Sequence, residues 1–165
     1  MVTIITGELH RGKTTRVKEL LKTIPDARGF VTEVVFAGEK RLGYDLRFII
    51  GGEPGLRTPF MRLIDDAKRV GLSPEAVQYQ LGKYVFFKEA FDRAEGQIQE
   101  ILENPPSTIV IEELGFLERD KKGFYPLVRA VLDSEADLIT AVRTSTLPGI
   151  IEAFALDDYR LIEVS

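Results

Sequence analysis

The sequence predicts a three-layer α/β fold, in which a mostly parallel sheet has helices on both faces. Short β-branched apolar runs alternate along the chain with amphipathic segments of helical periodicity, as in sheets whose parallel strands are joined by crossover helices. A glycine-containing stretch at residues 7–15 separates the first such strand from the first such helix, and ligands bind at junctions of this kind. The 165 residues, 44% of them hydrophobic, suit one domain over residues 1–165.

The first third of the chain predicts a strand, a helix and a hairpin. Residues 2–6 form a β-branched strand. A helix begins at about Lys13 and ends at Pro25, because apolar residues recur there at three- and four-residue spacing. Residues 30–36 and 42–50 are two strands joined by a short turn, and we expect this hairpin to add an antiparallel edge to the sheet.

The rest of the chain alternates between helices and strands after one stretch that is difficult to interpret. Residues 56–82 mix proline and glycine with short apolar runs, and Ser73-Pro74 indicates the start of a short helix. Beyond this stretch the predicted elements are a helix over 84–103, a strand over 108–111, a helix over 124–132, a strand over 137–142, a helix starting near Pro148 and a strand over 159–164.

Residues 7–14, Gly-Glu-Leu-His-Arg-Gly-Lys-Thr, match the G-x-x-x-x-G-K-[ST] pattern of a phosphate-binding P-loop. In such a loop successive backbone N–H groups face the bound phosphates, and the glycines allow tight turns. Lys13 would bridge the terminal phosphates, Thr14 would offer its hydroxyl to Mg²⁺, and Thr15 would reach an inner phosphate. The sequence therefore predicts a three-layer P-loop NTPase fold whose phosphate-binding residues are Gly7, Glu8, Leu9, His10, Arg11, Gly12, Lys13, Thr14 and Thr15.

The middle of this loop is unusual, because His10 and Arg11 stand where glycine is common. Histidine adopts left-handed backbone conformations more readily than most residues that carry a Cβ, so the loop can still close. We expect both side chains to face solvent or the rim of the site, with a contact from Arg11 to phosphate or to a partner's charge as the alternative.

Two consecutive acids, Glu112 and Glu113, follow the β-branched run 109–111 and supply the second part of the predicted site. A P-loop enzyme needs a carboxylate near its Mg²⁺ at the end of another strand, and this run has that form. We assign Glu112 to the Mg²⁺ shell together with Thr14, and Glu113 to orienting and deprotonating the attacking water. The alternative is that the two acids are a solvated strand end.

Arg143 follows the predicted strand 137–142 and is therefore expected at the same edge of the sheet. A cation at that place would neutralise charge on the transferring phosphoryl group, which makes Arg143 a candidate catalytic residue. A surface arginine at a strand end is the equal alternative, and Arg11 and Lys83 compete for the same role.

The composition argues against several other classes of function. The net charge is −4, so we expect no broad nucleic-acid surface. The chain has no cysteine and one histidine, which excludes disulfides, thiolate chemistry and multi-histidine metal sites. It shows neither an apolar run of membrane-spanning length nor a signal-peptide pattern, so we expect a cytoplasmic protein that does not contact membranes.

Taken together, these segments make the sequence resemble the small thermophilic nucleoside-triphosphatase family, whose relatives include the cancer-related nucleoside-triphosphatase. The likeness covers most of the chain. The last similar segment reads Glu-Glu-Leu-Gly-Phe-Leu-Glu, where the family has Asp-Glu-Ile-Gly-Lys-Met-Glu, so Glu112, Phe116 and Leu117 depart from the family pattern. The segments that carry the resemblance are residues 4–15, 29–33 with 41–45, 81–94 and 112–118.

The resemblance implies a fold in which one strand separates the metal-binding strand from the phosphate-loop strand. It also implies slow hydrolysis of several nucleoside triphosphates with Mg²⁺. Two other functions fit the same loop: a small-molecule kinase whose lid carries Arg57, Arg62 or Arg69, and a nucleotide-binding switch with little or no hydrolysis. A protein partner that supplies an arginine in trans would be consistent with weak activity of the chain alone.

Overall fold

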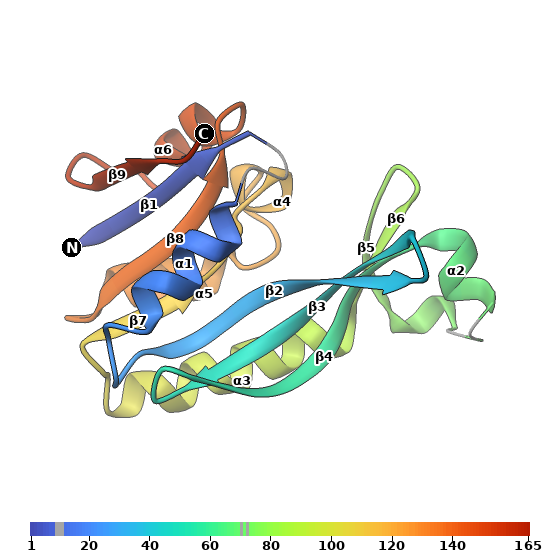
Figure 1. The fold of residues 1–165 in the computed structure, drawn as a ribbon, viewed down its shortest axis with the longest axis horizontal. Helices are drawn as coiled ribbons and strands as arrows, with labels where there is room; N and C mark the ends of the chain where they lie inside the picture. Colours follow the sequence, from blue (N-terminus) through green and yellow to red (C-terminus); the bar gives the residue numbers. More distant parts are fainter. Residues whose placement is uncertain (9–11, 70, 72) are drawn as a thin grey trace.

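The computed structural model describes residues 1–8, 12–69, 71 and 73–165 (Figure 1). Within these residues nine strands form one mixed sheet with the order β5-β6-β4-β3-β2-β7-β8-β1-β9. The strands are β1 (Val2–Gly7), β2 (Arg28–Ala37), β3 (Lys40–Ile50), β4 (Glu53–Leu63), β5 (Val77–Leu81), β6 (Tyr84–Phe87), β7 (Thr108–Ile111), β8 (Asp137–Arg143) and β9 (Arg160–Glu163). The predicted α/β class is confirmed.

Helices cover both faces of this sheet and give the predicted three layers. They are α1 (Lys13–Leu21), α2 (Ile64–Arg69), α3 (Lys88–Glu103), α4 (Phe116–Arg119), α5 (Tyr125–Leu132) and α6 (Leu147–Ala153), with a 3-10 turn η1 (Pro74–Ala76). Helix α1 packs against β1 and β8 on one face, whereas α3, α5 and α6 pack on the other (Figure 1). Among the described residues, no helix is long and apolar enough to cross a membrane.

Successive residues of the central strands enter two different cores. Ile4 belongs to the core beneath α3, α5 and α6, whereas Ile5 packs with Val17 and Leu21 of α1. In β7, Val110 packs in the core beneath α1, whereas Ile109 and Ile111 pack in the core beneath α3, α5 and α6. Side chains alternate between the faces of a strand, so a strand buried on both faces requires an unbroken apolar run. This requirement explains why unbroken apolar runs in the sequence mark these central strands.

The parallel half of the sheet brings the predicted site residues to one edge. Strands β2, β7, β8, β1 and β9 run parallel to one another, and β8 lies between β7 and β1. One strand therefore separates the strand before Glu112 from the strand before the phosphate loop, as the resemblance implies. At the carboxyl ends of these strands, Gly7 pairs with Arg143.

The antiparallel half of the sheet is larger than the hairpin that the sequence predicts. Strands β2 and β3 form that hairpin, but β3 continues into pairing with β4, and β4 is followed in the sheet by β6 and β5. The hairpin is therefore in the middle of the sheet. Figure 1 shows these long strands extending away from the parallel half, with α3 along them.

Two short elements differ from the sequence prediction. Residues 84–87, predicted as the first turn of a helix, form β6, and the helix begins at Lys88. The one-turn helix α4 has no counterpart in the prediction, because four residues are too few to show a helical period. The short helix predicted at Ser73-Pro74 is present as η1, which starts directly after Ser73.

Candidate active site

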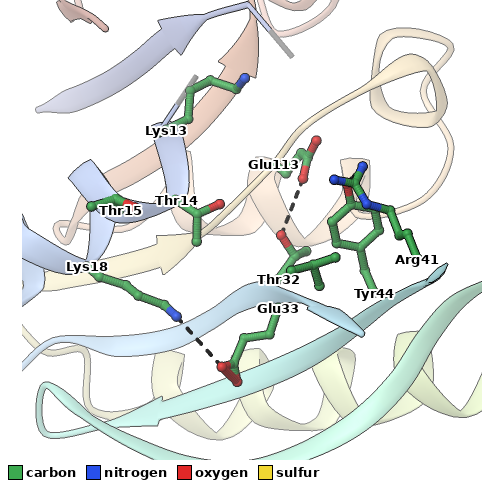
Figure 2. A pocket seen from close by; sticks show the side chains of 11 residues that line it. Lys13, Thr14, Thr15, Lys18, Thr32, Glu33, Arg41, Tyr44 and Glu113 are labelled. Carbon is green, nitrogen blue, oxygen red and sulfur yellow. Dashed lines mark hydrogen bonds and ion pairs between the residues drawn. The ribbon is translucent and has the colours of Figure 1, made fainter. Parts of the chain in front are cut away.

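A pocket of about 480 Å³ lies at the carboxyl edge of the parallel strands. Its walls come from the start of α1, from β2 and β3, and from the residue that follows Glu112 (Figure 2). Lys13, Thr14 and Glu113, which the sequence predicts for the site, all line this pocket. The fold thus brings together residues that are far apart in the chain.

Part of the predicted phosphate loop lies within the described residues. Strand β1 ends at Gly7, and Gly12 is the N-cap of α1. Gly12 has φ 86° and ψ 19°, a left-handed conformation in which a side chain would be strained. The first turn of α1 presents backbone N–H groups that have no partner inside the helix, as an anion site requires. The predicted residues Leu9, His10 and Arg11 lie outside the described residues.

The ammonium group of Lys13 turns back onto the loop. Its Nζ donates hydrogen bonds to the carbonyl oxygens of Gly7 at 3.3 Å and Glu8 at 2.8 Å, and the side chain is buried. Burial lowers the pKa of Lys13 below its usual value, whereas the carboxylates of Glu113 and Glu112 oppose this shift. Carbonyl oxygens do not neutralise an ammonium charge, so this position favours an anionic ligand.

Glu112 connects the first turn of α1 to β2 through one carboxylate oxygen. Its Oε1 accepts hydrogen bonds from Thr14 Oγ1 at 2.9 Å and Thr32 Oγ1 at 2.8 Å. Its Oε2 is buried and has no hydrogen-bond partner among the described residues. Burial raises the pKa of Glu112 to about 7; the hydrogen bond from Thr32 opposes this rise, and the Glu113 carboxylate adds to it. A buried carboxylate oxygen without a partner is unfavourable unless a cation or a proton meets it.

The oxygen atoms at this point fit Mg²⁺, the metal that the sequence predicts. Mg²⁺ binds oxygen ligands, keeps several waters and usually takes one or two protein groups. Thr14 Oγ1 and the unpartnered Oε2 of Glu112 are ligands of this type. The part of the chain that is described contains no group of three or more His, Cys, Asp or Glu side chains suited to a metal. A cation here would need water or ligand oxygens to complete its shell.

Glu113 enters the pocket from an unusual backbone conformation. Its φ is 66°, in the left-handed region, which costs on the order of 1 kcal/mol for a residue with a side chain. Its Oε2 accepts a hydrogen bond from Thr32 Oγ1 at 3.3 Å, and the side chain is partly exposed (Figure 2). Adjacent strand residues normally face opposite sides of a sheet. The turn at Glu113 instead lets Glu112 and Glu113 share one hydroxyl group.

Arg143, the last residue of β8, lies beside the pocket rather than in it. It lines a neighbouring cavity, and Glu113 lines both cavities. After burial and the Glu113 carboxylate, the Arg143 cation is the next influence on the pKa of Lys13, which it lowers. Among the described residues, Arg143 makes no ion pair shorter than 4.0 Å. It therefore lies at the predicted edge of the sheet, without an ion-pair partner in the described part of the chain.

Sequence reasoning does not assign Thr32, Arg41 and Tyr44 to the site, although all three line the pocket. Arg41 Nη1 lies 3.4 Å from the Tyr44 hydroxyl oxygen, and its guanidinium carbon lies 5.9 Å from the ring centroid (Figure 2). The one available signal is that Thr32 is a polar residue inside a buried strand. Its position follows from the pairing of Phe30 with Ile111, which sets β2 against β7.

The arginines considered for a lid make contacts elsewhere. Arg57 and Arg62 both form ion pairs with the buried Asp45, at 3.2 Å and 2.7 Å. Arg69 lies 3.8 Å from a carboxylate of its own helix, α2. Lys83 is in the turn between β5 and β6. None of these four cations lines the phosphate-loop pocket, so the arginines that the sequence analysis names for a lid do not reach it in this structure.

The site therefore combines a buried ammonium group, a helix N-terminus, two carboxylates and a hydroxyl group within one edge of the sheet. The first two attract anions, and the oxygen atoms suit a hard cation. The partly exposed Glu113 carboxylate can accept a proton from a group in the pocket. This set of groups suits the binding of a phosphate chain with a divalent cation and proton abstraction beside it.

Known proteins are similar to this chain in sequence and fold. The sequence model of a family described as NTPase matches residues 2–165. Nucleoside-triphosphatase THEP1 of Thermotoga maritima is 28% identical over 166 residues, which cover 100% of this chain and 87% of that protein. The crystal structure of THEP1 from the hyperthermophile Aquifex aeolicus has a TM-score of 0.71 and 25% identity, covering 100% of this chain and 90% of that one. The solution structure of a human cancer-related nucleoside triphosphatase has a TM-score of 0.66 and 24% identity, covering 99% and 88%, and supports the fold.

Proposed function

Because the chain belongs to the NTPase family, we propose that it hydrolyses nucleoside triphosphates to the diphosphate and phosphate in the pocket beside loop 7–15. The observation that carries this proposal is the meeting of Lys13, Thr14, Glu112 and Glu113 at one edge of the sheet. The enzyme is a single nucleotide-binding domain over residues 1–165. It acts in the cytoplasm, where nucleoside triphosphates and Mg²⁺ are abundant.

The phosphate chain binds to the loop and to the first turn of α1. The backbone N–H groups of residues 7–15 surround the inner phosphates, and Thr15 reaches one of them. Lys13 moves its ammonium group from the carbonyl oxygens of Gly7 and Glu8 to the terminal phosphates. The burial of Lys13 supports this role, because an ammonium group away from water attracts a phosphate more strongly.

Glu113 activates the attacking water. Its carboxylate orients the water and accepts its proton, while the water oxygen forms a bond to the terminal phosphorus and the bond to the bridging oxygen breaks. Arg143 offsets the charge that develops on the transferring group. The hydroxyl of Thr32 holds Glu113 in place, which supports the assignment of this side chain to a fixed role.

Thr14 and Glu112 would hold Mg²⁺ through Thr14 Oγ1 and Glu112 Oε2. When bound, Mg²⁺ neutralises phosphate charge and orients the phosphate chain. Such a cation would give the buried Oε2 the partner that the described residues do not provide. Glu112 is one carbon longer than the aspartate of the family motif, which supports slow turnover. We infer a broad base specificity from the resemblance to the nucleoside-triphosphatase family.

Phosphate release from ATP and GTP tests this proposal. The assay compares the wild type with Lys13→Ala and Glu113→Gln, each with and without Mg²⁺. We expect release by the wild type to require Mg²⁺. Lys13→Ala should lose phosphate release because the phosphates bind weakly. Glu113→Gln should lose phosphate release because no carboxylate accepts the proton of the attacking water.

Nucleotide binding separates the two variants. Glu113→Gln should bind a nucleoside triphosphate as the wild type does, whereas Lys13→Ala should not. Turnover that is unchanged in Glu113→Gln would contradict its role as the base. A wild type that binds nucleotide through Lys13 and releases no phosphate would contradict hydrolysis and leave a nucleotide-binding switch.

A further inference from the structure

A second cavity, of about 580 Å³, adjoins the phosphate-loop pocket. The two cavities share Thr32, Arg41, Tyr44 and Glu113, so they meet along one wall. A cavity of this volume is large enough for a small organic molecule. The hydrolysis proposed above uses Glu113 and Arg143 on one wall of this cavity and assigns no role to its apolar walls.

Apolar and aromatic side chains line most of the second cavity. Strands β4 and β6 contribute Phe60, Met61 and Phe86. The rings of Phe60 and Phe86 meet edge to face with centroids 5.2 Å apart. The segment after β7 contributes Phe116 and Leu117. A lining of this kind favours an apolar body of about the size of an aromatic ring system.

Three of the apolar lining residues remain accessible to solvent. Leu81 is 37% exposed, Tyr84 is 36% exposed and Phe116 is 47% exposed. They come from β5, β6 and α4, which the fold brings to the same cavity. Exposed apolar side chains that gather from separate elements indicate a binding surface rather than scattered surface residues.

The charged side chains of the cavity include Arg41, Glu118, Glu113 and Arg143. In the proposed reaction Glu113 takes a proton from the group that attacks the terminal phosphate. The cavity therefore lies at the terminal-phosphate end of the nucleotide rather than at its nucleoside end. A hydroxyl group that extends from this cavity toward Glu113 would stand where the attacking water stands.

We propose that the second cavity binds a second substrate, an organic alcohol with an apolar body of ring size, which accepts the terminal phosphoryl group in place of water. This inference rests on the proposed hydrolytic site and extends it. Glu113 takes the hydroxyl proton, the alcohol oxygen forms a bond to the terminal phosphorus, and the bond to the bridging oxygen breaks. The products are a nucleoside diphosphate and a phosphate monoester, and the proton passes from Glu113 to solvent.

The two methionines of the chain allow a direct test by NMR. Met61 lines the cavity, whereas Met1 precedes β1 at the end opposite the phosphate loop. Benzyl alcohol and naphthylmethanol are titrated into protein labelled with ¹³C at the methionine methyl groups. We expect the Met61 signal to shift and saturate while the Met1 signal stays in place. With ATP and Mg²⁺ added, ³¹P NMR should then show a phosphate monoester of the alcohol beside free phosphate.

A double variant and a matched control locate the binding. Leu81→Ala with Phe116→Ala removes two exposed walls and should weaken naphthylmethanol binding about tenfold. Leu56→Ala removes an apolar side chain that is 72% exposed on β4 and does not line the cavity. This control should bind naphthylmethanol as the wild type does. Both proteins should release phosphate from ATP at the wild-type rate when no alcohol is present.

Several results would overturn the inference. A Met61 signal that neither alcohol moves would show that the cavity does not bind such molecules. A Met61 signal that ADP shifts, with displacement of naphthylmethanol, would make the cavity the nucleoside site. Alcohol binding with no monoester would refute the acceptor role. In each case unchanged ATP hydrolysis by the wild type, and its loss in Glu113→Gln, would leave the proposed function standing. Hydrolysis independent of Glu113 would instead contradict that function.

Discussion

The hydroxyl of Thr14 donates a hydrogen bond of 2.9 Å to Oε1 of Glu112, and the two residues are 98 positions apart in the chain. Thr14 belongs to the first turn of α1, and Glu112 follows β7, which β8 separates from β1. This contact places the start of α1 next to Glu112 at the end of β7. A cation shared by the two residues needs this relative position.

Replacing Thr14 by alanine should raise the Mg²⁺ concentration needed for half-maximal phosphate release. The variant loses a ligand oxygen and the donor that orients Glu112, so we expect a rise of roughly 10- to 100-fold. Thr14→Ser keeps the hydroxyl and should stay close to the wild type. Phosphate release measured against Mg²⁺ concentration distinguishes these results. Equal Mg²⁺ curves for the alanine variant and the wild type would remove Thr14 from the metal site.

Replacing Arg143 by alanine should lower kcat with little change in KM. The cation is expected to act on charge that develops in the transition state, so we expect a loss of about 100-fold or more. The kcat of Arg143→Lys should lie between those of the wild type and Arg143→Ala, because an ammonium group keeps the charge without the planar donor geometry. Steady-state hydrolysis of ATP measures both constants.

The matched control for Arg143 is Arg160→Ala, which removes an exposed arginine at the start of β9. It should leave both kinetic constants unchanged. If Arg143→Ala raised KM and kept kcat, Arg143 would contribute to nucleotide binding in the ground state rather than to the chemical step.

Two glycines give a matched pair for the start of the loop. A Cβ added at Gly7 would lie 2.7 Å from both Cγ2 and the carbonyl oxygen of Val164, so β1 or the segment after β9 would have to move. Gly7→Ala should lower the free energy of unfolding by about 1–3 kcal/mol and weaken ATP binding. A Cβ added at Gly96 in α3 meets nothing within 4 Å. Gly96→Ala should raise the free energy of unfolding by about 0.5–1 kcal/mol and leave ATP binding unchanged.

Urea unfolding without nucleotide, followed by ATP titration, measures both effects of the glycine variants. The informative quantity is the difference between the two variants, since both add one methyl group. A Gly7→Ala protein as stable as Gly96→Ala would mean that Val164 can move aside without cost. The close approach at Gly7 would then have no part in shaping the loop.

The parallel half of the fold was predictable because each of its elements carries a local signal. The strand predicted over 108–111 has the same bounds as β7, since an unbroken apolar run there is flanked by prolines and acids. The helix predicted from Lys13 begins at that residue, because the loop pattern fixes the junction between β1 and α1. These signals depend on neighbours in the sequence and need no knowledge of the sheet order.

The antiparallel half depends on contacts that are distant in the sequence. Strand β4 contains Pro54 and Pro59, which weaken any strand signal, and its pairing with β3 includes shifts of register. The apolar residues of β6 continue the helical spacing of α3, and only their pairing with β4 and β5 makes them a strand. Thr32, Arg41 and Tyr44 could not be assigned to the site for the same reason. The pairing of β2 with β7 places Thr32 in the pocket, and the pairing of β3 with β2 brings Arg41 and Tyr44 beside it.

Glu118 should make the stability of the protein depend on pH. It lies in α4, and its two carboxylate oxygens accept hydrogen bonds from the backbone N–H groups of Gly115 at 2.8 Å and Phe124 at 2.9 Å. Burial raises the pKa of Glu118 from 4.5 to about 7, although both hydrogen bonds favour the charged form. The folded protein therefore keeps this proton to a higher pH than the unfolded chain does.

The sign of the effect follows from proton linkage. Below pH 4.5 both states hold the proton, and between pH 4.5 and about 7 the folded state holds more protons than the unfolded state. The free energy of unfolding should therefore fall as the pH rises through this window, by on the order of 3 kcal/mol from Glu118. Glu112 shifts in the same direction and adds to the slope.

Comparison of Glu118→Gln with the wild type isolates the contribution of Glu118. The amide does not titrate and, like the protonated acid, has one carbonyl oxygen that accepts a hydrogen bond. The variant should therefore be about as stable as the wild type at pH 4.5 and should lose less stability as the pH rises. Urea unfolding from pH 4.5 to 7.5 without Mg²⁺ measures the two slopes. Glu103→Gln, at an exposed acid that ends α3, is the control and should run parallel to the wild type. Parallel curves for Glu118→Gln would mean that Glu118 stays charged in the folded protein, held by the two backbone N–H groups.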